Sequence, residues 1–133
     1  MLEGTSMTEQ EKKTIAHNFI HGLGNRDGNL LRSIMTEDVI WSLPGESPMS
    51  GEALGMEAIL KRAHTLHGFN VNIEIEHVVF GLHDVALHLH NTGRYGGKVL
   101  DEHLTTILHL HGGKIRRLDT FISDIPMLDA YFS

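Results

Sequence analysis

The chain of 133 residues contains no cysteine, which excludes disulfides, a thiolate nucleophile and a cysteine-ligated zinc ion. No apolar run approaches the roughly 20 residues that a membrane-spanning helix needs. The formal net charge is -6, so the composition does not indicate a surface for nucleic acid or anionic lipid. Neither a glycine-rich phosphate loop nor a dinucleotide-binding fingerprint occurs in the sequence. We therefore expect a protein without an organic cofactor.

The first residues, Met1 to Ser6, do not combine a basic region with an apolar run. The sequence therefore predicts no secretory signal and a cytoplasmic location. The length fits one domain with one hydrophobic core. We expect an N-terminal tail over residues 1–7 and a single domain over residues 8–133.

Helical periodicity dominates the first half of the chain. Thr8 with Glu11 three residues later is a capping-box pattern, and the helix that follows ends around Gly22 to Asn25. A short second helix is predicted over residues 29–35. A third is predicted over residues 56–67, with Lys61 and Arg62 facing water.

After Gly68 the pattern changes to the alternation of β-strands. Strands are predicted over residues 71–79, 85–90, 99–110 and 115–123. Residues 93–97 are interpreted as a loop or bulge, and His111 to Lys114 as a tight hairpin. Pro126 opens a short C-terminal helix.

The most informative segment joins the two halves. Val39, Trp41 and Leu43 alternate as a short strand, which Pro44-Gly45 ends before a loop of small residues. This order of elements, with its Trp-x-x-Pro-Gly hinge, resembles the nuclear transport factor 2-like superfamily. That superfamily includes SnoaL-like polyketide cyclases, ketosteroid isomerases and limonene epoxide hydrolases. The resemblance implies an α+β fold, in which a curved, mostly antiparallel sheet wraps around three helices as a cystatin-like cone.

The resemblance also implies that the concave face of the sheet lines an apolar pocket for a small hydrophobic molecule. The alternative is a solidly packed core without a cavity. The predicted ligand-binding residues are Phe19, Trp41, Leu43, Ile59, Ala63, His67, Leu89, Asn91, Thr106, Leu118, Thr120 and Ile122.

The catalytic groups of the related enzymes are missing at the matching positions. Leu43, Phe19 and Thr106 stand where ketosteroid isomerases have an aspartate, a tyrosine and a second aspartate. The acid of limonene epoxide hydrolases falls on Thr120, although a register slip of one residue would bring in Asp119.

The remaining acid–base candidates are His67, Glu102 and Asp119, of which Glu102 can equally be salt-bridged near a strand end. Two functions stay open: a ligand-binding domain without catalysis, and an enzyme acting on a small lipophilic carbonyl, epoxide or polyketide-like substrate.

Histidine is frequent, with 11 residues. His64 and His67 lie three residues apart on one helix but lack a third ligand, so no metal site is predicted. Strand parity gathers other histidines on the outward face of the sheet, where we expect a homodimer. If these histidines pack neutral against each other and Arg117, protonation should loosen the dimer as the pH falls through roughly 6. If Asp119 pairs with a histidine instead, this pH effect should be weaker. The alternative is a solvated face. The predicted interface consists of His88, His90, His103, Ile107, His109, Arg117 and Phe121.

Overall fold

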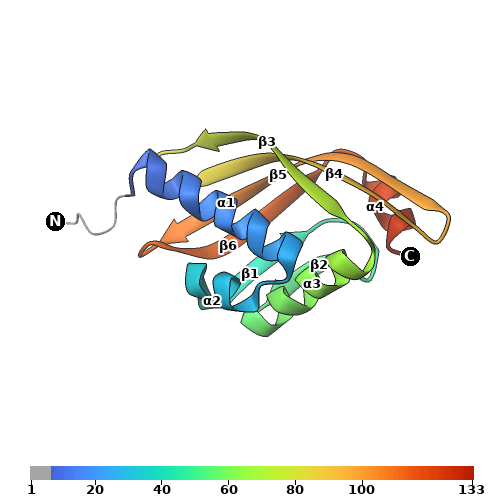
Figure 1. The fold of residues 1–133 in the computed structure, drawn as a ribbon, viewed down its shortest axis with the longest axis horizontal. Helices are drawn as coiled ribbons and strands as arrows, with labels where there is room; N and C mark the ends of the chain where they lie inside the picture. Colours follow the sequence, from blue (N-terminus) through green and yellow to red (C-terminus); the bar gives the residue numbers. More distant parts are fainter. Residues whose placement is uncertain (1–6) are drawn as a thin grey trace.

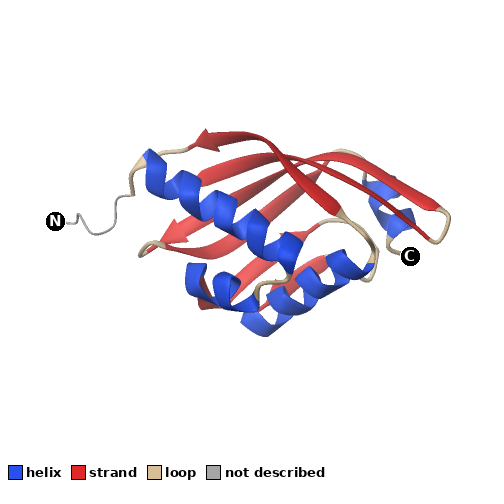
Figure 2. Ribbon diagram, viewed as in Figure 1, coloured by secondary structure: helices blue, strands red, loops and turns tan. Residues whose placement is uncertain are grey.

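The computed structural model describes residues 7–133, which form four helices and one six-stranded sheet (Figures 1 and 2). The helices are α1 (Glu9–Asn25), α2 (Gly28–Ile34), α3 (Met56–Gly68) and α4 (Ile125–Tyr131). The strands are β1 (Met35–Leu43), β2 (Gly51–Leu54), β3 (Asn72–Phe80), β4 (Val85–Tyr95), β5 (Lys98–His111) and β6 (Lys114–Ile122). The predicted tail lies outside the described residues except for Met7, which packs against the core.

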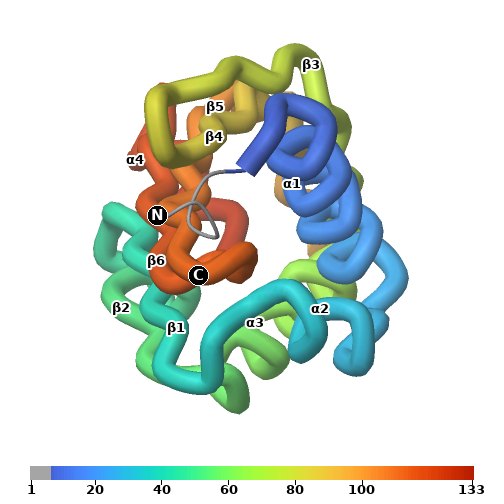
Figure 3. Tube along the Cα trace, turned by 90° about the vertical axis from the view of Figure 1, so that its left-hand side faces the viewer, coloured from blue at the N-terminus to red at the C-terminus, as the bar shows by residue number. Residues whose placement is uncertain are grey.

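The sheet has the strand order β2-β1-β6-β5-β4-β3, and all pairs are antiparallel except β1 with β6. It curves without closing, and α1, α2 and α3 cover its concave side (Figure 3). The short helix α4 lies at the end of the sheet nearest the C-terminus (Figure 1). The predicted α+β fold is confirmed.

Local signals in the sequence explain where α1 begins. The Thr8 hydroxyl accepts a hydrogen bond from the Glu11 amide at 3.0 Å, and the Glu11 carboxylate accepts one from the Thr8 amide at 2.8 Å. This reciprocal capping box satisfies donors that the first turn leaves free. The helix then buries Ala16 and Phe19 against the sheet.

Three details of the strands differ from the prediction. The loop of small residues contains β2, in which Gly51 pairs with Leu43 of β1. Gly93 lies inside β4, and the turn to β5 is at Gly96-Gly97. A bulge in β3 between Ile75 and His77 interrupts the alternation expected of a regular strand, so Val78 is partly buried and Val79 is exposed.

The prediction that Arg62 faces water is wrong. Its side chain is only 8% exposed and donates hydrogen bonds to three backbone carbonyls, of Trp41, Met49 and Gly51. The hinge segment bends over α3 and supplies these acceptors, an arrangement that helical periodicity alone does not reveal. No helix within residues 7–133 is both long and apolar enough to cross a bilayer. The cytoplasmic location stays a prediction.

Candidate functional site

An apolar cavity lies between the helices and the concave face of the sheet. The volume of this cavity is about 40 Å³. The cavity lining includes most of the residues predicted from the sequence: Phe19, Trp41, Leu43, Leu89, Asn91, Thr106, Thr120 and Ile122.

The remaining predicted residues lie elsewhere. Ile59, Ala63 and Leu118 are buried in the core around the cavity but do not line it. His67 is exposed on α3, because it follows the buried Leu66 and one residue turns a helix by about 100°. His67 is therefore corrected from a cavity residue to a surface residue, which also removes it as an acid–base group for the cavity.

Two segments outside the strands also contribute to the lining of the cavity. Met49 comes from the loop after β1, and Leu128 and Phe132 come from α4 and the residue after it. Asp129 of α4 ties these parts together, because its carboxylate accepts hydrogen bonds from the amides of Glu46 at 2.9 Å and Ser47 at 3.2 Å. The spacing of Leu128 and Phe132, four residues apart, was the available signal that one face of α4 turns inward.

The hydroxyl groups in the cavity wall are paired with one another. The Trp41 indole Nε1–H donates to Thr120 Oγ1 at 2.8 Å, and Thr120 Oγ1 lies 2.9 Å from Thr106 Oγ1. The Phe19 ring packs edge-on against Trp41 with a centroid separation of 5.7 Å. This wall is consequently apolar towards the cavity, with its hydrogen bonds already made.

Glu102 and Asn91 differ from that wall because each has a free oxygen. Glu102 is 1% exposed, and its Oε2 accepts hydrogen bonds from the Asp124 amide at 2.7 Å and the Ser123 hydroxyl at 3.4 Å. Among the described residues, no donor reaches the buried Glu102 Oε1 or the buried Asn91 Oδ1. The two residues pair directly across β4 and β5 and both line the cavity.

The environment of Glu102 raises the pKa of its carboxyl above the ordinary value. Burial raises the pKa of this carboxyl, and the negative charge of Asp124 adds to the effect, while hydrogen bonds from the Asp124 amide and Ser123 oppose it. Within residues 7–133 no cation pairs with Glu102, so the salt bridge considered from the sequence is replaced by hydrogen bonds at the junction between β6 and α4.

Asp119 faces away from the cavity, which settles the register of the last strand in favour of Thr120. Its carboxylate accepts hydrogen bonds from the Ser42 hydroxyl at 2.6 Å and Arg117 Nε at 3.1 Å, and it lies 2.9 Å from His109 Nε2. All of these partners are on the convex side of the sheet. Asp119 is therefore not an acid–base group of the cavity.

The three residues that the sequence matched to catalytic positions of ketosteroid isomerases all line the cavity. These residues are Leu43, Phe19 and Thr106, and none of them ionises near neutral pH.

Comparison with known proteins gives one family and a set of similar folds. A family model described as a SnoaL-like domain matches residues 16–118. A search of the curated proteins finds no significant match.

Among solved structures, an NTF2-like protein from Burkholderia xenovorans LB400 has a TM-score of 0.83 and 22% identity, over 96% of this chain and 100% of that one. A protein of unknown function with a cystatin-like fold from Xanthomonas campestris has a TM-score of 0.83 and 25% identity, over 92% and 98%. TerC, co-crystallized with polyporic acid, has a TM-score of 0.79 and 15% identity, over 92% and 99%.

Proposed function

We propose, from the premise that this chain belongs to the SnoaL-like domain family, that its cavity binds a small apolar molecule carrying a hydrogen-bonding group. The observation that supports this is the pair of free oxygens, Glu102 Oε1 and Asn91 Oδ1, in an otherwise apolar wall. A buried polar atom without a partner costs about 1–3 kcal/mol. A ligand hydroxyl that donates to one of these oxygens removes that cost for the oxygen it reaches, while the apolar lining holds the rest of the molecule.

The size of the cavity favours compact ligands. Its present volume of about 40 Å³ requires side chains to move before even a single ring is accommodated. Met49 in the wall suits such a change, because a methionine side chain is flexible and adapts to irregular shapes. We expect single-ring phenols and alcohols, whose hydroxyl can donate to the free oxygens of Glu102 and Asn91, to bind in preference to steroids. The complex of TerC with polyporic acid supports a small-molecule ligand on this fold.

Fluorescence tests this function, because Trp41 is the sole tryptophan and lines the cavity. Titration with phenol, cyclohexanol and cyclohexanone should give a saturable change in emission for at least one compound. Leu104→Phe adds bulk to the cavity wall and should weaken binding at least about tenfold, in line with the cost of overpacking. Leu82→Phe is the matched control, since Leu82 is 87% exposed in the turn between β3 and β4. Unchanged emission with all compounds, or equal binding by Leu104→Phe, contradicts the proposal.

A second candidate function is proton transfer at a carbon next to a carbonyl, with Glu102 as the acid–base group. The specific support is that Glu102 lines an apolar cavity and that its buried Oε1 has no protein donor among the described residues. The carboxylate would take the proton from carbon, leaving an enolate, and then return it.

Exchange of the α-hydrogens of cyclohexanone for deuterium, followed by NMR in D₂O, measures this step. Cyclohexanone serves as a simple model ketone, so the test does not depend on the natural substrate. Glu102→Gln keeps an acceptor for the Asp124 amide and should reduce exchange to the buffer rate, whereas Glu57→Gln on the surface of α3 should not. Exchange that persists in Glu102→Gln rules out this role and leaves the binding function standing.

A further inference from the structure

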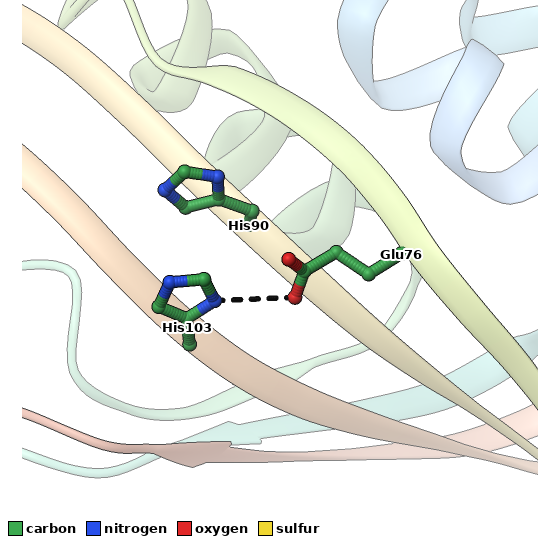
Figure 4. Close-up of side chains that lie close together, drawn as sticks. All are labelled: Glu76, His90 and His103. Carbon is green, nitrogen blue, oxygen red and sulfur yellow. Dashed lines mark hydrogen bonds and ion pairs between the residues drawn. The ribbon is translucent and has the colours of Figure 1, made fainter.

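Three side chains on the convex face bring metal-binding atoms together (Figure 4). Glu76, His90 and His103 come from the adjacent strands β3, β4 and β5, and one ligand atom from each lies within 4.8 Å of the others. His90 and His103 stand opposite one another in the register of β4 and β5. Glu76 is the extra residue at the bulge of β3, and such bulges re-aim side chains. This set is distinct from the His64–His67 pair considered in the sequence.

We infer that Glu76, His90 and His103 form a binding site for a divalent transition-metal ion, with zinc as the first candidate. Two imidazoles and one carboxylate are a donor set that zinc uses, with a fourth position left to water or a ligand. At zinc–ligand bonds of about 2.0–2.1 Å, ligand atoms in a tetrahedral site lie ~3.4 Å apart. His103 Nδ1 and Glu76 Oε1 are already 3.1 Å apart, so one edge of the site is close to its final length.

Neighbouring carboxylates orient the His90 ring for binding a metal ion. Its Nε2 lies 2.6 Å from Asp101 Oδ1, and donation to this carboxylate leaves the Nδ1 lone pair free on the side of Glu76 (Figure 4). Carboxylate–histidine pairs of this kind orient metal ligands. Glu74, which pairs with His90 across the strands, and Asp101 add negative charge beside Glu76, and this field attracts a cation.

Binding requires a small rearrangement of the two rings. His90 and His103 stack with their centroids 4.3 Å apart and their planes at 7°, so their lone pairs run side by side rather than converging. Rotation of the His103 ring about its Cβ–Cγ bond aims Nδ1 at the shared ion. The His103 side chain is 62% exposed, so solvent gives it room to turn.

Calorimetric titration of the tag-free protein with Zn²⁺ tests the site, and Co²⁺ provides a second readout through its visible absorption bands. We expect one ion per chain. His103→Ala, His90→Ala and Glu76→Gln should each weaken binding at least about tenfold, and Asp101→Asn should weaken it about 10–100-fold, the usual effect of losing an orienting carboxylate. Thermal melts of each variant show that it is folded. The exposed His103 gives the decisive variant if His90→Ala does not fold.

The matched control is His64→Ala/His67→Ala, which removes two exposed histidines one turn apart on α3 and should leave zinc affinity unchanged. Three outcomes overturn the inference: no saturable binding of Zn²⁺, affinity retained in His103→Ala, or affinity lost in the α3 control.

Discussion

Among single residues, Arg62 holds a charged group inside the protein by satisfying it with backbone carbonyls. Its Nη1 and Nη2 lie 2.8 Å from the carbonyl oxygens of Trp41 and Met49, and Nη2 lies 3.2 Å from that of Gly51. Burial lowers the pKa of Arg62 to about 10, which still leaves it protonated at neutral pH. The residue thereby fastens the end of β1, the following loop and the start of β2 to α3.

Arg62→Met should lower the free energy of unfolding by about 2–4 kcal/mol, because several buried carbonyls lose a charged donor at once. Urea denaturation measures the effect. The control Lys61→Met makes the same change at the neighbouring exposed position and should shift stability by less than ~0.5 kcal/mol. Equal stability of the two variants would show that the Arg62 hydrogen bonds contribute little.

The hydrogen bonds of Asp119 should make the free energy of unfolding depend on pH. Burial, the largest single influence, raises the pKa of this carboxyl, but hydrogen bonds from Ser42 and His109 and the charge of Arg117 together outweigh it and lower the pKa. A carboxyl with a lowered folded-state pKa stabilises the protein fully above its unfolded pKa of about 3.9. That contribution disappears as the pH falls through the lower, folded pKa.

Asp119→Asn should therefore be destabilised relative to the parent at pH 7, and the difference should shrink below pH ~4 as the parent loses the same charge. Urea unfolding at a series of pH values checks both parts. Asp38→Asn, at an exposed position of β1, should show no such convergence. A difference that stays constant down to pH 3 would mean that Asp119 acts through its shape rather than its charge.

At the scale of helices and strands, the sequence correctly predicted the features that residues close together in the chain determine. Thr8 with Glu11 gave the start of α1, and His111 to Lys114 gave the hairpin between β5 and β6. The bulge near Glu76 was not predicted, because it depends on how β3 pairs with β4. The residues of β3 alone do not indicate this pairing. The sequence predicts a loop or bulge at Gly93, because glycine within a strand pattern usually marks a turn or a bulge.

Gly93 is needed within β4 because two groups approach its backbone. A Cβ at this position would lie 2.6 Å from the Tyr131 hydroxyl and 2.8 Å from the Asn70 carbonyl oxygen. The Tyr131 hydroxyl in turn donates to the Phe69 carbonyl, so Gly93 is the place where β4, α4 and the segment after α3 meet.

Gly93→Ala should destabilise the protein by about 1–3 kcal/mol, the range for overpacking, and should loosen α4. Gly24→Ala provides the same substitution in open space near the end of α1, where it should be neutral or stabilising by up to about 1 kcal/mol. Thermal melts and hydrogen exchange of the α4 amides measure both effects. Unchanged protection of α4 in Gly93→Ala would contradict the assigned role.

At the scale of the whole molecule, strand parity explains which residues of β5 and β6 reach the cavity, and docking of separate segments decided the rest. Thr106, Thr120 and Ile122 reach the cavity because alternate residues of a strand share one face. Met49 and Leu128 reach it only through the packing of the hinge loop and α4 onto the sheet, which the sequence does not encode locally. The prediction for His67 was wrong because an error of one residue on a helix turns a side chain from the core to water.

We propose that the convex face of the sheet is the interface of a homodimer. Phe121 is 57% exposed at its centre, opposite Thr105 of β5, with Ile107 partly buried nearby. The sequence left two arrangements open on this face: neutral histidines that pack together and repel once protonated, or a histidine paired with Asp119, which would weaken that pH effect. In the structure His109 lies between Asp84, at 3.1 Å, and Asp119, at 2.9 Å, so it contacts carboxylates of its own chain, as in the second arrangement.

Light scattering at pH 7.5 and 5.5, in EDTA so that no metal bridges the chains, should therefore find a dimer at both values rather than one that loosens with acid. Phe121→Glu puts a charge at the centre of the proposed two-fold contact, where the same patch of both chains meets, and should give a monomer. Leu82→Glu makes a comparable change at an exposed turn outside that face and should remain dimeric. A monomer at both pH values removes the dimer, and a dimer that tolerates Phe121→Glu moves the interface away from the convex face. Dissociation only at pH 5.5 would support the first arrangement, with repulsion between protonated histidines, and show that the carboxylate partners of His109 do not control assembly.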